Sequence, residues 1–78
     1  MTPITEEWAV KAGFKKVTDD TFKLEVNLSY DGERIITIAR LPKGWIAYYE
    51  VNKIAASSVK YYIEEVKELY KGLTGKEI

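Results

Sequence analysis

FKLEVNLSYDGERIITIARLPKGWIAYYEV, residues 22–51, is the stretch of sequence that decides the fold. Its first part alternates apolar and polar residues, a pattern typical of a strand with one buried face. The DG pair at 31–32 favours a two-residue hairpin turn, because both residue types tolerate a positive φ. The LPKG sequence at 41–44 favours a second turn. The stretch therefore predicts three consecutive antiparallel strands.

The turn at 31–32 sets the register of the first hairpin, and the register decides which face each side chain occupies. A two-residue turn there places Val26 opposite Thr37. It likewise places Leu24 opposite Ala39. The face predicted to meet the core is then apolar or small throughout, with Phe22, Leu24, Val26, Leu28, Tyr30, Ile35, Thr37, Ala39, Leu41, Trp45, Ala47, Tyr49 and Val51. The small residues Thr37, Ala39 and Ala47 would let a helix lie close to the sheet.

Helices are predicted on both sides of this stretch. Near the N-terminus, Thr5 can cap a short helix that Gly13 ends. Toward the C-terminus, residues 57–73 carry apolar side chains at the helical period, with a serine at the start as cap and Gly72 as the stop. The residues expected on the buried side of this helix are Val59, Tyr62, Ile63, Val66, Leu69, Tyr70 and Leu73.

The expected fold class is α+β, with a short N-terminal helix, a three- to four-stranded antiparallel meander, and a C-terminal helix packed on one sheet face. A further edge strand is expected from the KKV segment at 15–17, followed by a turn at 19–20. The chain of 78 residues is expected to form a single domain, 1–78. Its hydrophobic content of 46% is enough for a compact core.

The composition excludes several chemistries. The absence of cysteine excludes disulfides and thiolate chemistry, and the absence of histidine removes the commonest general base and metal ligand. GLTGKE at 72–77 lacks the glycine spacing of a phosphate-binding loop. The acidic pairs at 6–7 and 64–65 would point in different directions on a helix. We therefore expect no catalytic, cofactor-binding or metal-binding residues, no small-molecule substrate and no enzymatic activity.

Charge and hydropathy indicate where the protein acts. Lys plus Arg equals Asp plus Glu at 12 each, so the chain has no overall charge that would attract nucleic acid or an anionic membrane. The start does not read as a signal peptide, and no segment approaches the ~20 apolar residues of a membrane span. We expect a soluble, cytoplasmic protein that does not bind membranes.

One surface stands out as a candidate binding site. In the predicted register, Ile36 and Ile38 lie on the outer sheet face beside Ile46 and Tyr48. A contiguous apolar patch on a polar face tends to mark a contact surface. Two alternatives stay open: a central strand favours β-branched residues in any case, or the N-terminal segment covers this face. The candidate partner-binding residues are Ile36, Ile38, Arg40, Ile46 and Tyr48, and the expected partner is another protein or a second copy of the chain.

Nucleic-acid binding through the same outer face is the alternative function. Lys23 and Arg40 would supply cations and Tyr48 a ring for base stacking. Glu25 and Glu50 place opposing charges on that face, so nucleic acid is not the expected partner.

Both ends of the chain carry distinctive motifs, PITEEWAVKAGFKKV at 3–17 and LYKGLTGKEI at 69–78. Together they resemble a group of small proteins from bacteria of the Bacteroidetes type and their phages or prophages, which pair an LTEEWLLKxGF-like start with an LYxxLTGxEL-like end. The matching residues are Thr5, Glu6, Glu7, Trp8, Lys11, Gly13, Phe14, Leu69, Tyr70, Leu73, Thr74, Gly75 and Glu77.

The resemblance covers the two ends alone and implies an origin more than a mechanism. The group has an HQLQN-like segment where this chain has EEVKE at 64–68, so no role of that histidine or asparagine carries over. The resemblance implies a phage or mobile-element origin. By analogy with small phage proteins, it implies action by binding a host protein, for example by inhibiting a defence nuclease.

Overall fold

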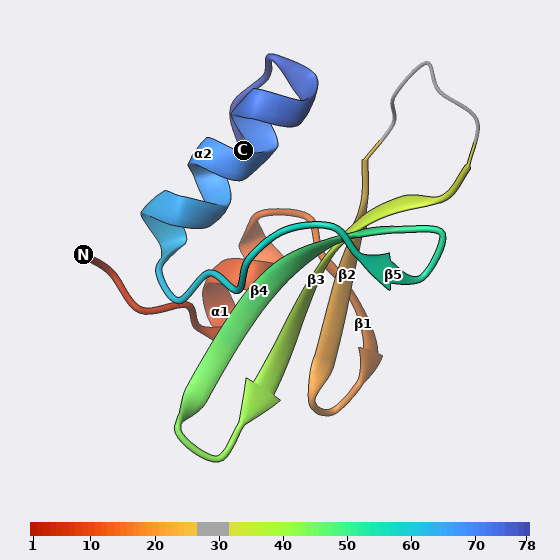
Figure 1. Cartoon of the computed structure of the whole chain (residues 1–78). Coiled ribbons are helices and arrows are strands. Elements are labelled where there is room, and N and C mark those ends of the chain that lie inside the picture. Colours follow the sequence, from red (N-terminus) through yellow and green to blue (C-terminus); the bar gives the residue numbers. More distant parts are fainter. Residues whose placement is uncertain (27–31) are drawn as a thin grey trace.

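The computed structural model describes residues 1–26 and 32–78, which form one antiparallel sheet with two helices (Figure 1). The elements are α1 Glu6–Lys11, β1 Lys15–Thr18, β2 Thr21–Glu25, β3 Arg34–Leu41, β4 Gly44–Val51, β5 Ile54–Ala55 and α2 Ile63–Thr74. The sheet is a five-stranded meander in the order β1-β2-β3-β4-β5. The predicted α+β class is confirmed, and β5 adds a strand of two residues. In the described part of the chain, neither helix is long and apolar enough to cross a membrane.

Local signals determine α1 as predicted. The Thr5 Oγ1 atom accepts a hydrogen bond from the Trp8 N–H over 3.1 Å and caps the helix. Gly13 takes φ +101°, which lets the chain leave the helix. A helix of six residues is not stable alone, and it is anchored by burial of Ala9 and Phe14.

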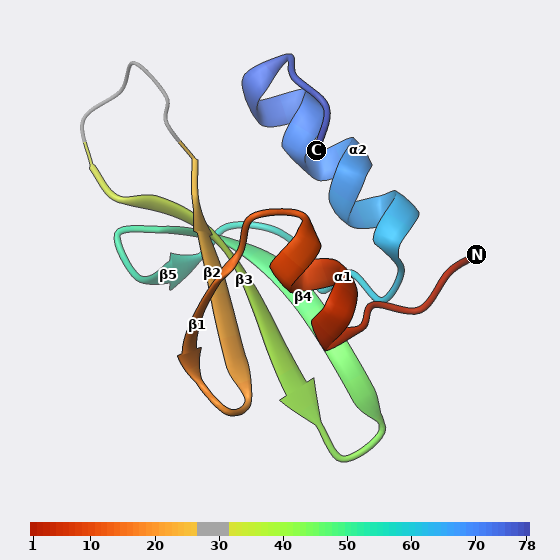
Figure 2. The same cartoon turned by 180° about the vertical axis from the view of Figure 1, so that it is seen from behind.

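Both helices contribute to one core on the same face of the sheet. Figure 2 shows α1 lying across this face, with α2 next to it. The buried apolar residues are Ile4, Ala9, Phe14, Phe22, Val26, Ile36, Ile38, Ala47, Tyr49, Ile63 and Val66. The N-terminal helix therefore covers the core face, and the other face of the sheet carries no helix among the described residues.

The register between β2 and β3 differs from the predicted one. Leu24 pairs with Ile36 rather than with Ala39, a shift of three positions along β3. Phe22 pairs with Ile38. Because side chains alternate along a strand, a shift by an odd number of residues moves every β3 side chain to the opposite face.

The prediction that Ile36 and Ile38 face outward is therefore wrong. Both are 0% exposed and lie in the helix-covered core. Thr37 and Ala39, predicted to make room for a helix, belong to the opposite face. The second turn lies at 41–44 as predicted, with Leu41 paired with Gly44. The predicted β3–β4 register is wrong, because Ala47 lies opposite Ile38 and does not share a face with Ala39.

Hydrogen bonds at both ends of β3 hold the observed register. The Val26 N–H donates to the Arg34 carbonyl over 2.8 Å at one end. The Arg40 N–H donates to the Asp20 carbonyl over 2.8 Å at the other. Burying two isoleucines contributes about 1.5–3 kcal/mol each, more than burying threonine and alanine in their place. Apolar burial therefore outweighs the local preference for a two-residue turn.

The predicted core positions Leu28 and Tyr30, and Asp31 of the predicted turn, lie outside the described residues.

The segment before α2 is extended, although the sequence predicts a helix from its serines onward. The Ser57 Oγ atom accepts a hydrogen bond from the Tyr49 N–H over 3.0 Å instead of capping a helix. Lys60 exchanges two backbone hydrogen bonds with Ala47, over 2.8 and 2.7 Å. Because these bonds tie the segment to the edge of β4, Val59 stays 41% exposed instead of joining the core.

The helix α2 begins and ends later than predicted. Its N-cap is Tyr62, and a Glu65 Oε1 atom accepts the N–H groups of Tyr61 and Tyr62 over 3.0 and 3.2 Å. Its C-cap is Gly75 with φ +74°, not Gly72. The predicted core position Tyr62 is consequently 38% exposed.

The register can be tested by truncating neighbouring isoleucines. We expect Ile36→Ala to lower the free energy of unfolding by about 2–5 kcal/mol, because it opens a cavity in the core. Ile35→Ala is the matched control, since Ile35 is half-buried on the other face, and we expect a loss of about 1 kcal/mol. Urea denaturation followed by circular dichroism measures both. A larger loss for Ile35→Ala would contradict the observed register.

Candidate functional site

The five residues predicted to bind a partner do not form one surface. Ile36 and Ile38 are in the core. Arg40 is exposed near the end of β3. Ile46 and Tyr48 are half-buried in β4, on the face opposite the core. The apolar patch therefore does not exist as predicted.

Arg40 is held by neighbours within the protein. Its Nε atom donates to Asp20 Oδ1 over 2.8 Å, and a second guanidinium nitrogen pairs with the same carboxylate. Its guanidinium also lies 5.5 Å from the centroid of the Trp45 ring, a cation–π contact. The contacts fix Arg40 over Trp45 instead of leaving it available to a ligand.

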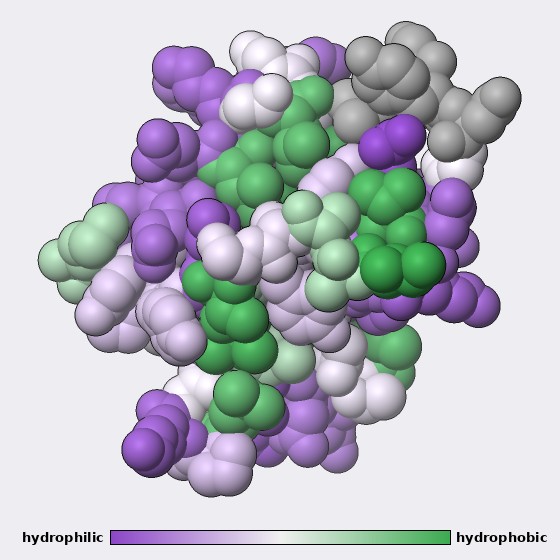
Figure 3. All heavy atoms as spheres, in the orientation of Figure 1, coloured by the Kyte–Doolittle hydropathy of each residue, from purple (hydrophilic) through white to green (hydrophobic). Residues whose placement is uncertain are grey.

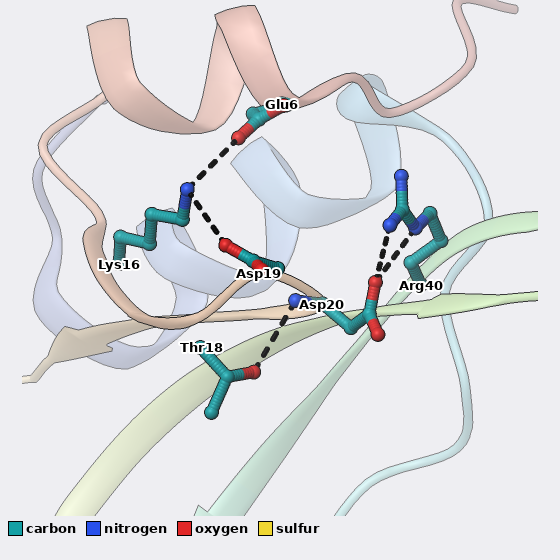
Figure 4. Close-up of polar contacts among 6 residues, drawn as sticks. All are labelled: Glu6, Lys16, Thr18, Asp19, Asp20 and Arg40. Carbon is teal, nitrogen blue, oxygen red and sulfur yellow. Dashed lines mark hydrogen bonds and ion pairs between the residues drawn. The ribbon is translucent and has the colours of Figure 1, made fainter.

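The turn between β1 and β2 presents Asp20 to Arg40 (Figure 4). The Asp20 N–H donates to Thr18 Oγ1 over 3.2 Å. The Lys16 Nζ atom lies 3.2 Å from Asp19 Oδ1 and 4.0 Å from Glu6 Oε1. Such exposed ion pairs contribute little stability, but they orient the turn.

The middle of the outer sheet face is polar and internally paired. The Thr37 hydroxyl donates to Glu50 Oε1 over 2.5 Å, and Thr37 is 1% exposed. The Lys23 ammonium lies 4.0 Å from the same oxygen. Burial, and secondly the charge of Glu50, raise the pKa of Tyr48 above its usual value. The cation and the ring proposed for nucleic-acid binding thus both lie beside a carboxylate.

A groove of about 610 Å³ lies at one end of the sheet, between the β3–β4 hairpin, the first residues of the chain and the segment before α2. Its lining is mostly apolar, with three aromatic rings and two prolines: Pro3, Ile4, Leu41, Pro42, Lys43, Gly44, Trp45, Ile46, Tyr61 and Tyr62. Leu41 is 48% exposed and Tyr61 is 57% exposed. Figure 3 shows hydrophobic groups gathered above the tip of this hairpin, at the lower left.

The groove forms where the chain leaves the edge of β4. Lys60 still bridges to Ala47, but Tyr62 bridges to Pro3 instead of continuing along β4. The Ile63 N–H donates to the Thr2 carbonyl over 2.8 Å, which holds the N-terminal arm, residues 1–4, against the start of α2. The arm and the tyrosine pair therefore form one wall, and the hairpin forms the other.

Glu64 clamps this arm to α2. Its two carboxylate oxygens accept hydrogen bonds from the N–H and the hydroxyl of Thr2, each over 2.7 Å. The backbone N–H of Thr2, and then its hydroxyl, lower the pKa of Glu64 to about 2. The clamp acts together with the bridge between Pro3 and Tyr62 to hold the arm beside the groove.

Of the predicted binding residues, only Ile46 lines the groove. The remaining lining residues are brought together by pairing between segments that are distant in the sequence. No local sequence pattern predicts such pairing. One feature of the sequence pointed to this surface. Tyr61 and Tyr62 are adjacent, and adjacent residues of a helix do not share a face, so a helix could not bury both rings against the sheet. No group of three or more His, Cys, Asp or Glu able to hold a metal occurs among residues 1–26 and 32–78.

The clamp predicts a pH dependence. The pKa of Glu64 is about 2 in the folded protein and 4.5 by its ordinary value, so the contribution of Glu64 to stability is present above about pH 4.5 and is lost as the pH falls through about 2. We expect an NMR titration of the Glu64 carboxyl carbon to have its midpoint near 2. Thr2→Val removes the hydroxyl but keeps the N–H, so the midpoint should rise partway toward 4.5. A wild-type midpoint near 4.5 would show that the arm is not clamped.

Comparisons with known proteins do not assign the chain to a family. No family model, no curated protein and no solved structure matches it. The function is therefore inferred from the groove and the residues around it.

Proposed function

We propose that the protein is a non-enzymatic protein-binding module of the cytoplasm that holds its partner in the groove beside the β3–β4 hairpin. The observation that carries this proposal is the exposed apolar lining of the groove. Leu41 and Tyr61 remain accessible there although water contact is unfavourable for such side chains. Tyrosine and tryptophan are enriched at the centres of protein interfaces.

The lining of the groove offers mostly apolar surface to a partner. Among the described residues that line this groove, the polar side-chain groups are the Lys43 ammonium, two tyrosine hydroxyls and the indole N–H of Trp45. The groove is thus suited to apolar side chains presented by another chain.

The alternative of nucleic-acid binding has less support. Arg40 is paired with Asp20, and Lys23 lies beside Glu50. A phosphate would have to displace a carboxylate at each position.

The origin and the target are proposals that rest on the resemblance of the chain ends. That resemblance supports a phage or mobile-element protein that binds a host protein, for example an inhibitor of a defence nuclease. An exposed apolar groove is compatible with this mode of action.

Matched aspartate substitutions test the proposal. Leu41→Asp places a charge in the groove, whereas Ile54→Asp places one at an exposed aliphatic residue that does not line it. Affinity purification from host extract with quantitative mass spectrometry should capture partner proteins with wild type and Ile54→Asp and lose them with Leu41→Asp. Circular dichroism checks that both variants fold.

Two outcomes would contradict the proposed function. One is that Leu41→Asp captures the same proteins as wild type. The other is that the captured material is nucleic acid, released by nuclease and by a moderate increase in salt.

A further inference from the structure

Trp45 lines the groove and directs its backbone N–H and C=O toward the outer edge of β4. Hydrogen-bonded and non-hydrogen-bonded residue pairs alternate along an antiparallel ladder. The Asn52 N–H donates to the Glu33 carbonyl over 2.7 Å, so this pair is of the hydrogen-bonded kind. The pair of Arg40 and Trp45 lies an odd number of positions farther along the same ladder, so it is a non-hydrogen-bonded pair. The backbone groups of Trp45 therefore point away from β3, toward the outer edge of β4.

The same edge is occupied at the neighbouring outward positions. Ala47 exchanges both of its backbone hydrogen bonds with Lys60. The backbone groups of Tyr49 bond to residues 56–57. Beyond Lys60 the chain turns away to the N-terminal arm, and within residues 1–26 and 32–78 no hydrogen bond reaches the outward groups of Trp45. An open strand edge of this kind is a template for another extended segment.

The open edge lies between apolar walls. Leu41 and Pro42 belong to the hairpin wall, and Tyr61 and Tyr62 to the other. Side chains of an added strand would point alternately to its two faces. A segment bound here can therefore place apolar side chains on both sides of its backbone.

The charge of the groove determines which charged residue a bound segment should carry. Of the described residues that line the groove, Lys43 carries the single charge, and it forms no ion pair with another described residue. At the opposite end, Glu64 and Glu65 already accept backbone N–H groups of the protein itself. Arg40, next to the groove, is neutralised by Asp20. The unmatched charge is thus positive and sits at the hairpin tip.

We propose that the groove binds an extended segment of another protein, which adds to the edge of β4 at Trp45 and places an acidic side chain beside Lys43. This inference rests on the proposed function and specifies the chemistry of the partner. The segment would carry apolar residues next to an aspartate or glutamate.

Selection from a displayed library of random linear peptides tests the charge rule. Wild type should enrich peptides with apolar residues next to Asp or Glu. Lys43→Glu should enrich Lys or Arg at that position, and Lys67→Glu, an exposed lysine of α2 that does not line the groove, should select as wild type does. A synthetic peptide selected on wild type should bind Lys43→Glu at least about fivefold more weakly, because attraction becomes repulsion.

Hydrogen exchange tests the strand addition. We expect binding of the selected peptide to slow exchange of the Trp45 backbone amide, measured by NMR, because this N–H becomes a donor to the peptide. An unchanged exchange rate in a saturated complex would overturn strand addition at Trp45.

The remaining outcomes separate this inference from the proposed function. If wild type and Lys43→Glu select apolar peptides with the same charged residues, the inference is overturned and the groove remains a binding site. Peptides that bind Leu41→Asp as tightly as wild type would overturn both. A dimer in sedimentation that Leu41→Asp dissociates would identify a second copy as the occupant and overturn the acidic segment.

Discussion

The pairing of Phe22 with Ile38 and of Leu24 with Ile36 is the constraint on which the rest of the structure depends. It turns both isoleucines toward the helices, where each is completely buried. It also leaves Thr37 on the opposite face, where its hydroxyl bonds to Glu50. The outer face therefore has a polar, internally satisfied centre, and the apolar surface that remains exposed lies elsewhere.

The same pairing determines the surroundings of the groove. Phe22 packs edge-on against Trp45, with ring centroids 5.7 Å apart, and this contact fixes Trp45 at the base of the β3–β4 hairpin. Arg40 lies over the same indole and is itself held by Asp20. The hairpin wall of the groove is thus supported from the core, whereas the opposite wall depends on the bridge between Pro3 and Tyr62.

Features set by neighbouring residues could be predicted from the sequence. The cap at Thr5 and the turn at 41–44 are both observed, because each depends on a few adjacent residues. The β2–β3 register could not be predicted this way, since it is decided by apolar burial across the whole sheet rather than by the DG pair. The start of α2 was missed for a similar reason: the bridge between Lys60 and Ala47 joins segments that are distant in sequence. The groove was not predicted, because it needs both that bridge and the N-terminal arm. Of the residues predicted to bind a partner, Ile46 alone lines it.

The β2–β3 register can be measured directly by nuclear Overhauser effects between α protons. The bonds from Val26 to Arg34 and from Arg40 to Asp20 mark the hydrogen-bonded pairs, so Lys23 and Thr37 form a non-hydrogen-bonded pair with closely spaced α carbons. The structure predicts a strong cross-peak between the α protons of Lys23 and Thr37. Cross-peaks that place Thr37 opposite Val26 instead would contradict the register and the burial of Ile36 and Ile38 that follows from it.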